Sequence, residues 1–154
     1  MIKQKTFRII GMLALLVALA GLMACNSEET VTLQSEQNGV IMKITYVAEG
    51  DEVIEQSTES EIPYSSLMVT TKEEAQAILD PIVAEIQGTE GLEHNIDYQD
   101  DKAIETMTID YTTADLSEIS ALPGSTFEGE EGADTVSLEQ SVEMMESQGF
   151  EVVE

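Results

Sequence analysis

Apolar and polar residues alternate along the chain after about residue 30, which is the pattern of half-buried β-strands. Asn38-Gly39 separates the first two alternating stretches and is the strongest two-residue hairpin signal, because both residues accept a positive φ. A second turn is predicted at Glu49-Gly50-Asp51. The three predicted strands, which form a meander, cover residues 31–37, 40–48 and 52–61.

A helical period replaces the alternation after residue 70. Thr70 and Thr71 each have a glutamate three residues later, which is the spacing of a capping box at a helix start. Pro81 is expected to kink this helix or to break a backbone bond near Ala77, and Gly88 to end it. The apolar face is interpreted as core against a sheet, the alternative being a face that docks on a partner. Its residues are Ala75, Ile78, Leu79, Ile82, Val83 and Ile86.

The remainder of the chain predicts a later hairpin, further helices and a short final strand. The hairpin strands cover 92–98 and 103–111, and a short helix is expected over 114–122. Ser137 and Gln140 repeat the capping-box spacing before a last helix that Gly149 ends. Together these elements predict an α+β fold: an antiparallel sheet, built from a three-strand meander plus a later hairpin, with two or three helices on one face.

The first 24 residues are interpreted as a signal peptide. Three basic residues precede an uncharged apolar run over 9–24, which is shorter than the about 20 residues that a membrane-spanning helix needs. The run ends in Leu22-Met23-Ala24-Cys25, which resembles the lipobox of bacterial lipoprotein signals. That resemblance implies cleavage between Ala24 and Cys25 and acylation of Cys25, with palmitate among the acyl chains. The alternative is an uncleaved anchor helix that ends in an ordinary buried cysteine.

These assignments divide the chain into three parts: the signal peptide over 1–24, the lipidated Cys25 with a tether over 25–30, and one α+β domain over 31–154. Two or more acyl chains hold a protein stably on a bilayer. We therefore expect a lipid anchor in the cell membrane, with the domain facing outside the cytoplasm.

Acidic residues outnumber basic ones by thirty-one to six, for a formal charge of -25 at pH 7. Three of the six bases lie in the first eight residues, and no acid precedes Glu28. A surface of this sign repels phosphate backbones, which excludes nucleic-acid binding. It also repels anionic lipid head groups, so the membrane attachment has to be hydrophobic or covalent.

Few residue types that carry catalytic or metal chemistry are present. The only cysteine excludes an intrachain disulfide, and the lack of a Cys/His cluster excludes a zinc or iron–sulfur site. His94 is the only histidine; it lies on an alternating apolar face and is interpreted as a packed strand histidine or strand-edge residue rather than a general base or ligand. There is no G-x-S-x-G elbow, P-loop or G-x-G-x-x-G run. No cofactor is expected.

Carboxylates gather at two places, and two interpretations of them stay open. Ca²⁺ takes six to eight oxygen ligands, which clustered carboxylates with glycines between them supply. Neither cluster has EF-hand spacing, so each is either a divalent-cation site or a solvated acidic surface. The two clusters are Asp97, Asp100 and Asp101, and Glu128, Glu130, Glu131 and Asp134.

Several short motifs are spread over roughly residues 38–153. They are Ile44-Thr45-Tyr46, Gly50-Asp51-Glu52-Val53, Gln56, Thr70-Thr71-Lys72-Glu73-Glu74-Ala75, Leu79-Asp80-Pro81, Thr108-Ile109-Asp110, and Met144-Met145 with Gly149-Phe150. On these motifs the chain resembles the YehR family of small bacterial lipoproteins. The resemblance implies an α+β fold and a lipid anchor, and it carries over no catalytic or ligand-binding residue.

The sequence therefore favours a non-enzymatic, lipid-anchored envelope protein that acts as a binding or interaction module, with an envelope protein or a small ligand as its partner. The alternative is a lipoprotein that binds a divalent cation through its acidic loops. An envelope hydrolase has no supporting motif, and only six aromatic residues follow the signal peptide to line a sugar cleft.

Overall fold

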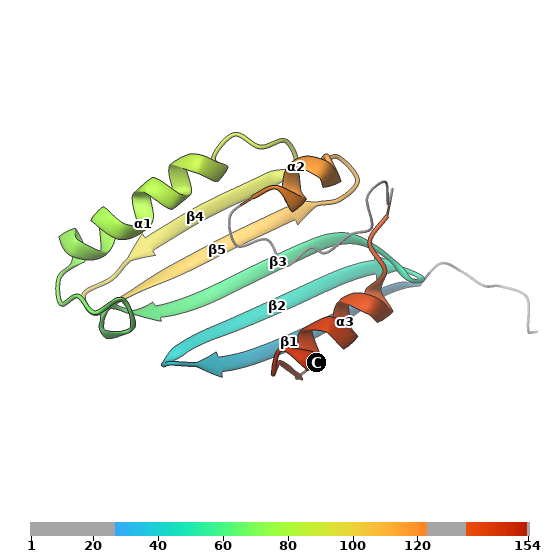
Figure 1. The fold of residues 1–154 in the computed structure, drawn as a ribbon. Coiled ribbons are helices and arrows are strands. Elements are labelled where there is room, and N and C mark those ends of the chain that lie inside the picture. Colours follow the sequence, from blue (N-terminus) through green and yellow to red (C-terminus); the bar gives the residue numbers. More distant parts are fainter. Residues whose placement is uncertain (1–26, 123–134, 154) are drawn as a thin grey trace, which may run out of the picture.

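The computed structural model describes residues 27–122 and 135–153, which form an antiparallel sheet with helices packed against it (Figure 1). This confirms the α+β class. The strands are β1 (Glu28–Gln37), β2 (Val40–Glu49), β3 (Glu52–Pro63), β4 (Leu92–Tyr98), β5 (Lys102–Asp110) and β6 (Glu151–Val152). The helices are the 3₁₀ turn η1 (Tyr64–Leu67), α1 (Lys72–Ile86), α2 (Leu116–Ser120) and α3 (Leu138–Ser147).

The strand order in the sheet is β4-β5-β3-β2-β1-β6, and all neighbouring strands are antiparallel. The β4–β5 hairpin returns to the sheet so that β5, rather than β4, pairs with β3. At the far edge, β6 pairs with β1 over only two residues. Three strands, β3, β2 and β1, therefore separate the hairpin from β6.

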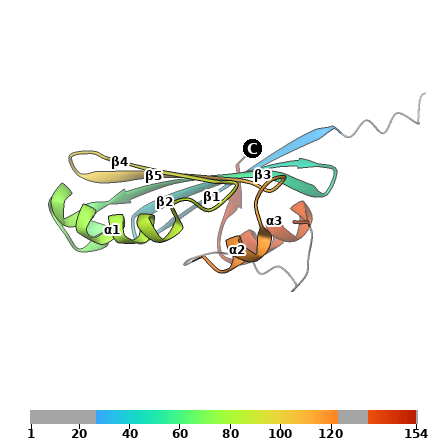
Figure 2. The ribbon, with the colours of Figure 1, turned by 90° about the horizontal axis from the view of Figure 1, so that it is seen from above.

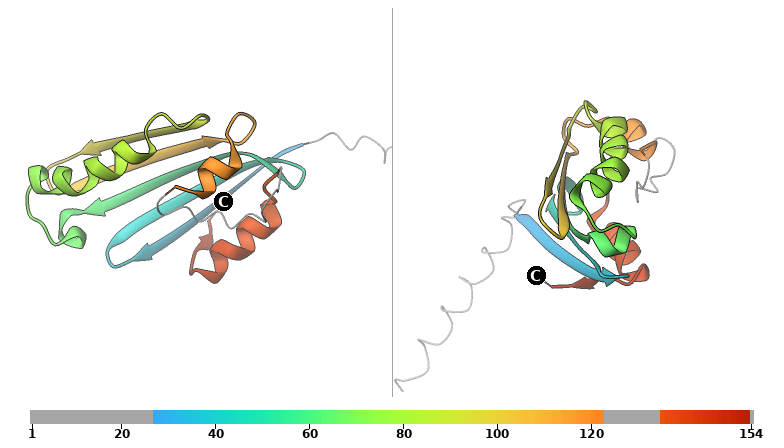
Figure 3. Two further views of the ribbon diagram at one scale, coloured as in Figure 1. Left: turned by 45° about the horizontal axis from the view of Figure 1, so that its top comes forward. Right: turned by 90° about the vertical axis from the view of Figure 1, so that its left-hand side faces the viewer.

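All three α-helices lie on the same side of the sheet, as the views in Figures 2 and 3 show. Helix α1 runs beside β4 and β5, whereas α3 lies beside β1 and β2 (Figure 1). No described helix covers the other side of the sheet (Figure 2). The sheet therefore has one packed face and one face that the described helices leave open.

The first hairpin forms as its sequence requires. Asn38 and Gly39 have φ values of 54° and 82°, the left-handed conformations that a tight turn between twisted strands needs. Strand β1 begins at Glu28, so Glu28–Thr30 belongs to the sheet and not to the predicted tether. The β1–β2 pairing continues to the Glu28–Glu49 pair.

Helix α1 begins with a complete capping box. The hydroxyl of Thr71 accepts a hydrogen bond from the N–H of Glu74, and the Glu74 carboxylate accepts one from the N–H of Thr71. The helix continues through Pro81, an exposed position. The prediction of its apolar face was too broad: Leu79 is buried, but Ile78 and Ile82 are 40% and 46% exposed.

Most of the buried apolar side chains of the described residues form two clusters. The larger one lies between β1, β2 and α3 and includes Leu33, Ile44, Tyr46 and Met145. The smaller one lies under α1 and consists of Tyr64, Ala75, Leu79 and Ala103. Burial of these apolar side chains is what holds the helices to one face of the sheet.

Candidate functional site

Side chains alternate between the two faces of each strand. Because the apolar ones mostly point toward the helices, the face without described helices carries mostly polar side chains. Ile44 and Tyr46 of β2 are buried in the core, so Lys43 and Thr45 point to the other side. The register extends these positions into four rows across the sheet, which we call the uncovered face. Its residues are Thr30, Thr32, Gln34 and Glu36 of β1, Ile41, Lys43, Thr45 and Val47 of β2, Glu55, Ser57, Glu59 and Glu61 of β3, Ile104, Thr106, Thr108 and Asp110 of β5, and Glu93, Asn95 and Asp97 of β4.

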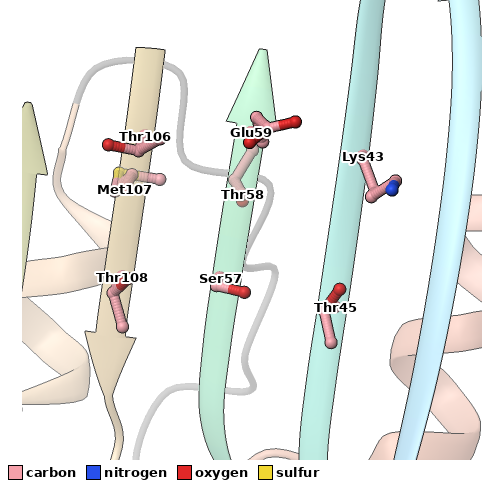
Figure 4. A pocket seen from close by; sticks show the side chains of 8 residues that line it. All are labelled: Lys43, Thr45, Ser57, Thr58, Glu59, Thr106, Met107 and Thr108. Atoms are coloured by element: carbon pink, nitrogen blue, oxygen red, sulfur yellow. The ribbon is translucent and has the colours of Figure 1, made fainter. Parts of the chain in front are cut away.

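A hollow of about 300 Å³ lies near the centre of the uncovered face. Figure 4 shows that its side chains come from the three adjacent strands β2, β3 and β5. Short Thr and Ser side chains lie in the middle of the hollow, and the longer side chains of Lys43 and Glu59 lie beside them. The short side chains leave the centre of the hollow unfilled. The lining residues are Lys43, Thr45, Ser57, Thr58, Glu59, Thr106, Met107 and Thr108.

The hydroxyl groups of this face are already partly ordered. Thr32 of β1 is buried, and its Oγ1 lies 3.1 Å from Oγ1 of Thr45, its cross-strand neighbour. A hydroxyl both donates and accepts hydrogen bonds, so a row of them accommodates a polar partner of either kind. The titratable side chains that line the hollow are Lys43 and Glu59.

Negative charge surrounds the hollow. The four rows contain seven carboxylates and one lysine, Lys43. Glu61 is paired with Lys102 at an Nζ–Oε2 distance of 2.5 Å, and this ion pair raises the pKa of Lys102. Glu55, Glu59 and Glu93 are exposed and make no ion pair within the described ranges. The face is therefore acidic at its margins and hydroxyl-rich at its centre.

His94 lies on the opposite, helix-bearing face. Its Nε2 is 2.7 Å from Oε1 of Glu105, and its side chain is only 3% exposed, which confirms the interpretation as a packed strand histidine. Among the described residues, its Nδ1 and the hydroxyl of buried Ser60 have no hydrogen-bond partner. In the register, Ser60 faces Glu105, and His94 lies one strand further away. Glu105 thus lies between the two, so these residues do not form a nucleophile–histidine pair.

Tyr46 is buried, and Tyr98 and Tyr111 are partly buried. Burial raises the pKa of Tyr46 to about 12 and also raises that of Tyr111, whose hydroxyl donates to Oε1 of Gln56 at 2.9 Å. Burial and a 2.6 Å hydrogen bond to Asp80 raise the pKa of Tyr98. These phenols therefore stay protonated at neutral pH.

The predicted acidic cluster at Asp97, Asp100 and Asp101 lies at the end of β4 and in the turn before β5. Within residues 27–122 and 135–153, no group of three or more His, Cys, Asp or Glu side chains is arranged to hold a metal ion. These three residues are therefore not brought together as ligands. The second predicted cluster (Glu128, Glu130, Glu131 and Asp134) and the predicted cleavage and lipidation residues, Ala24 and Cys25, lie outside the described residues.

Sequence reasoning missed the hydroxyl hollow. The signal was present in part, since Thr45 lies between Ile44 and Tyr46 and Thr108 lies between Met107 and Ile109. The sequence does not specify which strands are neighbours in the sheet. Only the pairing of β3 with β5 brings Ser57 beside Thr108 and so makes one surface from residues more than 50 positions apart.

The comparison with known families agrees with the resemblance described above. A family model described as "Protein of unknown function (DUF1307)" matches residues 29–151. The chain belongs to this family. The lipoprotein YehR of Escherichia coli is among its relatives, with 31% identity over 97% of both chains. The prediction of a YehR-type lipoprotein is thereby confirmed.

Other relatives carry the same kind of name. The uncharacterized lipoprotein Lmo0207 of Listeria monocytogenes is 41% identical over 86% of both chains, and Lin0239 of Listeria innocua is 41% identical over 86% of this chain and 87% of its own. These names support the assignment as a lipoprotein. In the described part of the chain, no helix has the length and apolar character needed to cross a bilayer.

Two solved structures share the fold. The NMR structure of Escherichia coli YehR superposes with a TM-score of 0.73 at 32% identity, over 84% of this chain and 93% of that one. An NMR structure of a protein from Streptococcus pneumoniae gives a TM-score of 0.58 at 14% identity, over 99% and 98% of the two chains. The second similarity extends the fold beyond recognisable sequence relatives.

Proposed function

We propose that this protein is a non-enzymatic, lipid-anchored binding module that takes its partner on the uncovered face of its sheet, outside the cytoplasm. The observation that carries this proposal is the hollow at the centre of that face, lined by Lys43, Glu59 and a set of Thr and Ser hydroxyls. The helices occupy the other side of the sheet, so a partner reaches this face without displacing any described element (Figure 2).

The size of the face suits a protein partner. Five strands spaced about 4.8 Å apart, with central strands of about ten residues at roughly 3.4 Å each, give an area of roughly 800 Å². A stable protein–protein interface covers about 800 Å² on each partner. A sheet face with small side chains at its centre also lets the partner approach the backbone closely.

The proposal of a binding rather than a catalytic role rests on the chemistry of the two faces. The described residues that most resemble a serine–histidine–acid set are Ser60, His94 and Glu105. The strand order places Glu105 between Ser60 and His94. The uncovered face offers hydroxyls, one lysine and carboxylates, which recognise polar groups.

Anchoring through Cys25 would place the binding face close to the lipid. Strand β1 starts at Glu28, three residues after Cys25, and an extended chain spans at most about 3.5 Å per residue. The start of β1 is then held within about 10 Å of the acylated residue. The partner of such a module lies at the membrane surface rather than far from it.

Site-specific photocrosslinking in cells tests this role. A photoreactive amino acid replaces Thr106 on the uncovered face or, as a control, Glu85 on the exposed side of α1. We expect a discrete crosslinked product from position 106 that is absent from position 85. Ser57→Phe, which fills the hollow, is expected to abolish that product while the protein is still acylated and folded. The same products from both positions, or none from position 106, would contradict the proposal.

A further inference from the structure

We infer that the partner of the uncovered face is a basic polypeptide surface, one that presents Lys and Arg side chains to the sheet. This inference rests on the proposed function and specifies the chemistry of its partner. It follows from the charge of the face, from the arrangement of its hydroxyls and from the place of Lys43 within it.

The charge of the face is one-sided. Seven carboxylates and one lysine occupy the four rows, and only Glu61 has a cationic partner in the described part of the chain, namely Lys102. Like charges this close repel one another, and a cationic partner relieves that repulsion when it binds. Complementary potentials also accelerate encounter and exclude partners of the wrong sign.

The carboxylates are spread over the face and do not converge. Glu55, Glu59 and Glu93 come from different rows or different strands, and no group of three acids within the described residues is arranged to hold a metal. A small cation needs converging oxygens, whereas a protein surface with several basic side chains matches charges that are spread out. The hydroxyls of Thr45, Ser57 and Thr108 supply hydrogen bonds to polar groups between those charges.

Lys43 provides a test of the sign of the partner's charge. It stands in the hollow beside Glu59, to which it is opposite in the β2–β3 register, and it makes no ion pair within the described ranges. Toward a basic partner Lys43 is the one repulsive charge of the four rows. Removing its charge should therefore strengthen binding, whereas removing neighbouring carboxylates should weaken it.

The experiment uses the full-length acylated protein in a neutral detergent and fluorescein-labelled octalysine as the probe, measured by fluorescence anisotropy. One variant combines Glu55→Gln, Glu59→Gln and Glu93→Gln on the uncovered face. The matched control combines Glu85→Gln, Glu143→Gln and Glu146→Gln, which are exposed residues of α1 and α3 with the same total change of charge. A third variant carries Lys43→Gln alone.

We expect the face variant to raise the Kd for octalysine about fivefold or more, and the control to change it by less than about twofold. Lys43→Gln should lower the Kd. Equal weakening by the two triple variants would show general attraction to an acidic protein and overturn the inference, as would a raised Kd for Lys43→Gln. If the Thr106 crosslink persists in either case, the binding face stands and only the partner's chemistry is wrong. If that crosslink is absent, the proposed function itself fails.

Discussion

Asp51 shows how a single turn residue holds two distant parts of the chain together. Its Oδ1 accepts a hydrogen bond from the N–H of Glu139 at 2.9 Å, and its Oδ2 accepts one from the hydroxyl of Ser137 at 2.8 Å. Its own carbonyl accepts from the N–H of Leu138. The β2–β3 turn thus satisfies the free N–H groups at the start of α3, where a negative charge is also favoured by the helix dipole.

Asp51→Asn is expected to lower the melting temperature at pH 7. The hydrogen bond from the N–H of Glu139, and then that from Ser137, lower the pKa of Asp51 below its ordinary value of 3.8. Because this carboxyl is more acidic in the folded chain, its charge adds stability above that value, and the contribution is lost as the pH falls below it. The difference in melting temperature between the parent and the variant should therefore shrink toward pH 3.

Glu52→Gln is the matched control, because it removes the same charge as Asp51→Asn. Glu52 is the exposed neighbour of Asp51, and its side chain makes no hydrogen bond within the described residues. This variant should leave the melting temperature unchanged or raise it slightly, because it only reduces repulsion. A loss for Glu52→Gln as large as that for Asp51→Asn would show that α3 does not depend on the Asp51 carboxylate.

Helix α1 illustrates the limits of periodicity at the scale of an element. The spacing of its apolar residues places Ile78, Leu79 and Ile82 close together on the helix, but a sheet contacts only a narrow strip of a helix surface. Leu79 lies in that strip, packed in the cluster with Tyr64 and Ala103, whereas Ile78 and Ile82 lie at its flank. The width of the buried strip depends on what the helix packs against, which periodicity does not specify.

This difference predicts unequal costs for two truncations in α1. Leu79→Ala should lower the free energy of unfolding by about 2–4 kcal/mol, because it leaves a cavity in the smaller cluster. Ile82→Ala should cost less than about 1 kcal/mol, because that side chain is about half exposed. Denaturant unfolding measures both. Equal costs would mean that the flank of α1 is as buried as its centre.

The charge of the molecule as a whole acts on its stability. Thirty-one acids face six bases, and within the described residues one carboxylate, that of Glu61, is paired with a lysine, Lys102. Most carboxylates therefore experience more repulsion than attraction. Such self-repulsion destabilises a compact state and weakens when salt shortens the screening length to about 10 Å at 0.1 M.

Monovalent salt is accordingly expected to raise the melting temperature of the full chain between about 0.01 M and 0.15 M, over which the screening length falls from about 30 Å to about 8 Å. A neutral osmolyte that leaves the ionic strength constant serves as the control for general solvent effects. A melting temperature that stays the same over this range of salt would show that the acids are already neutralised by bound counter-ions.

Local signals in the sequence determined the elements themselves. Asn38-Gly39 made the first hairpin, and Thr71 with Glu74, one of the two predicted capping boxes, began α1. The alternation of Ile44 and Tyr46 with Lys43 and Thr45 assigned the faces of β2. Each of these features depends on backbone conformation or on contacts between residues a few positions apart. They can therefore be predicted from short stretches of the sequence.

Only the tertiary structure decided which elements meet. The pairing of β3 with β5, the capping of α3 by Asp51 and the exposure of Ile82 all depend on long-range packing. The hollow on the uncovered face has the same origin, since it joins Thr45, Ser57 and Thr108 from three strands. The physical reason is that local periodicity identifies only which side of a helix or strand is apolar. The arrangement of the helices and strands depends on how all of these apolar sides are buried against one another.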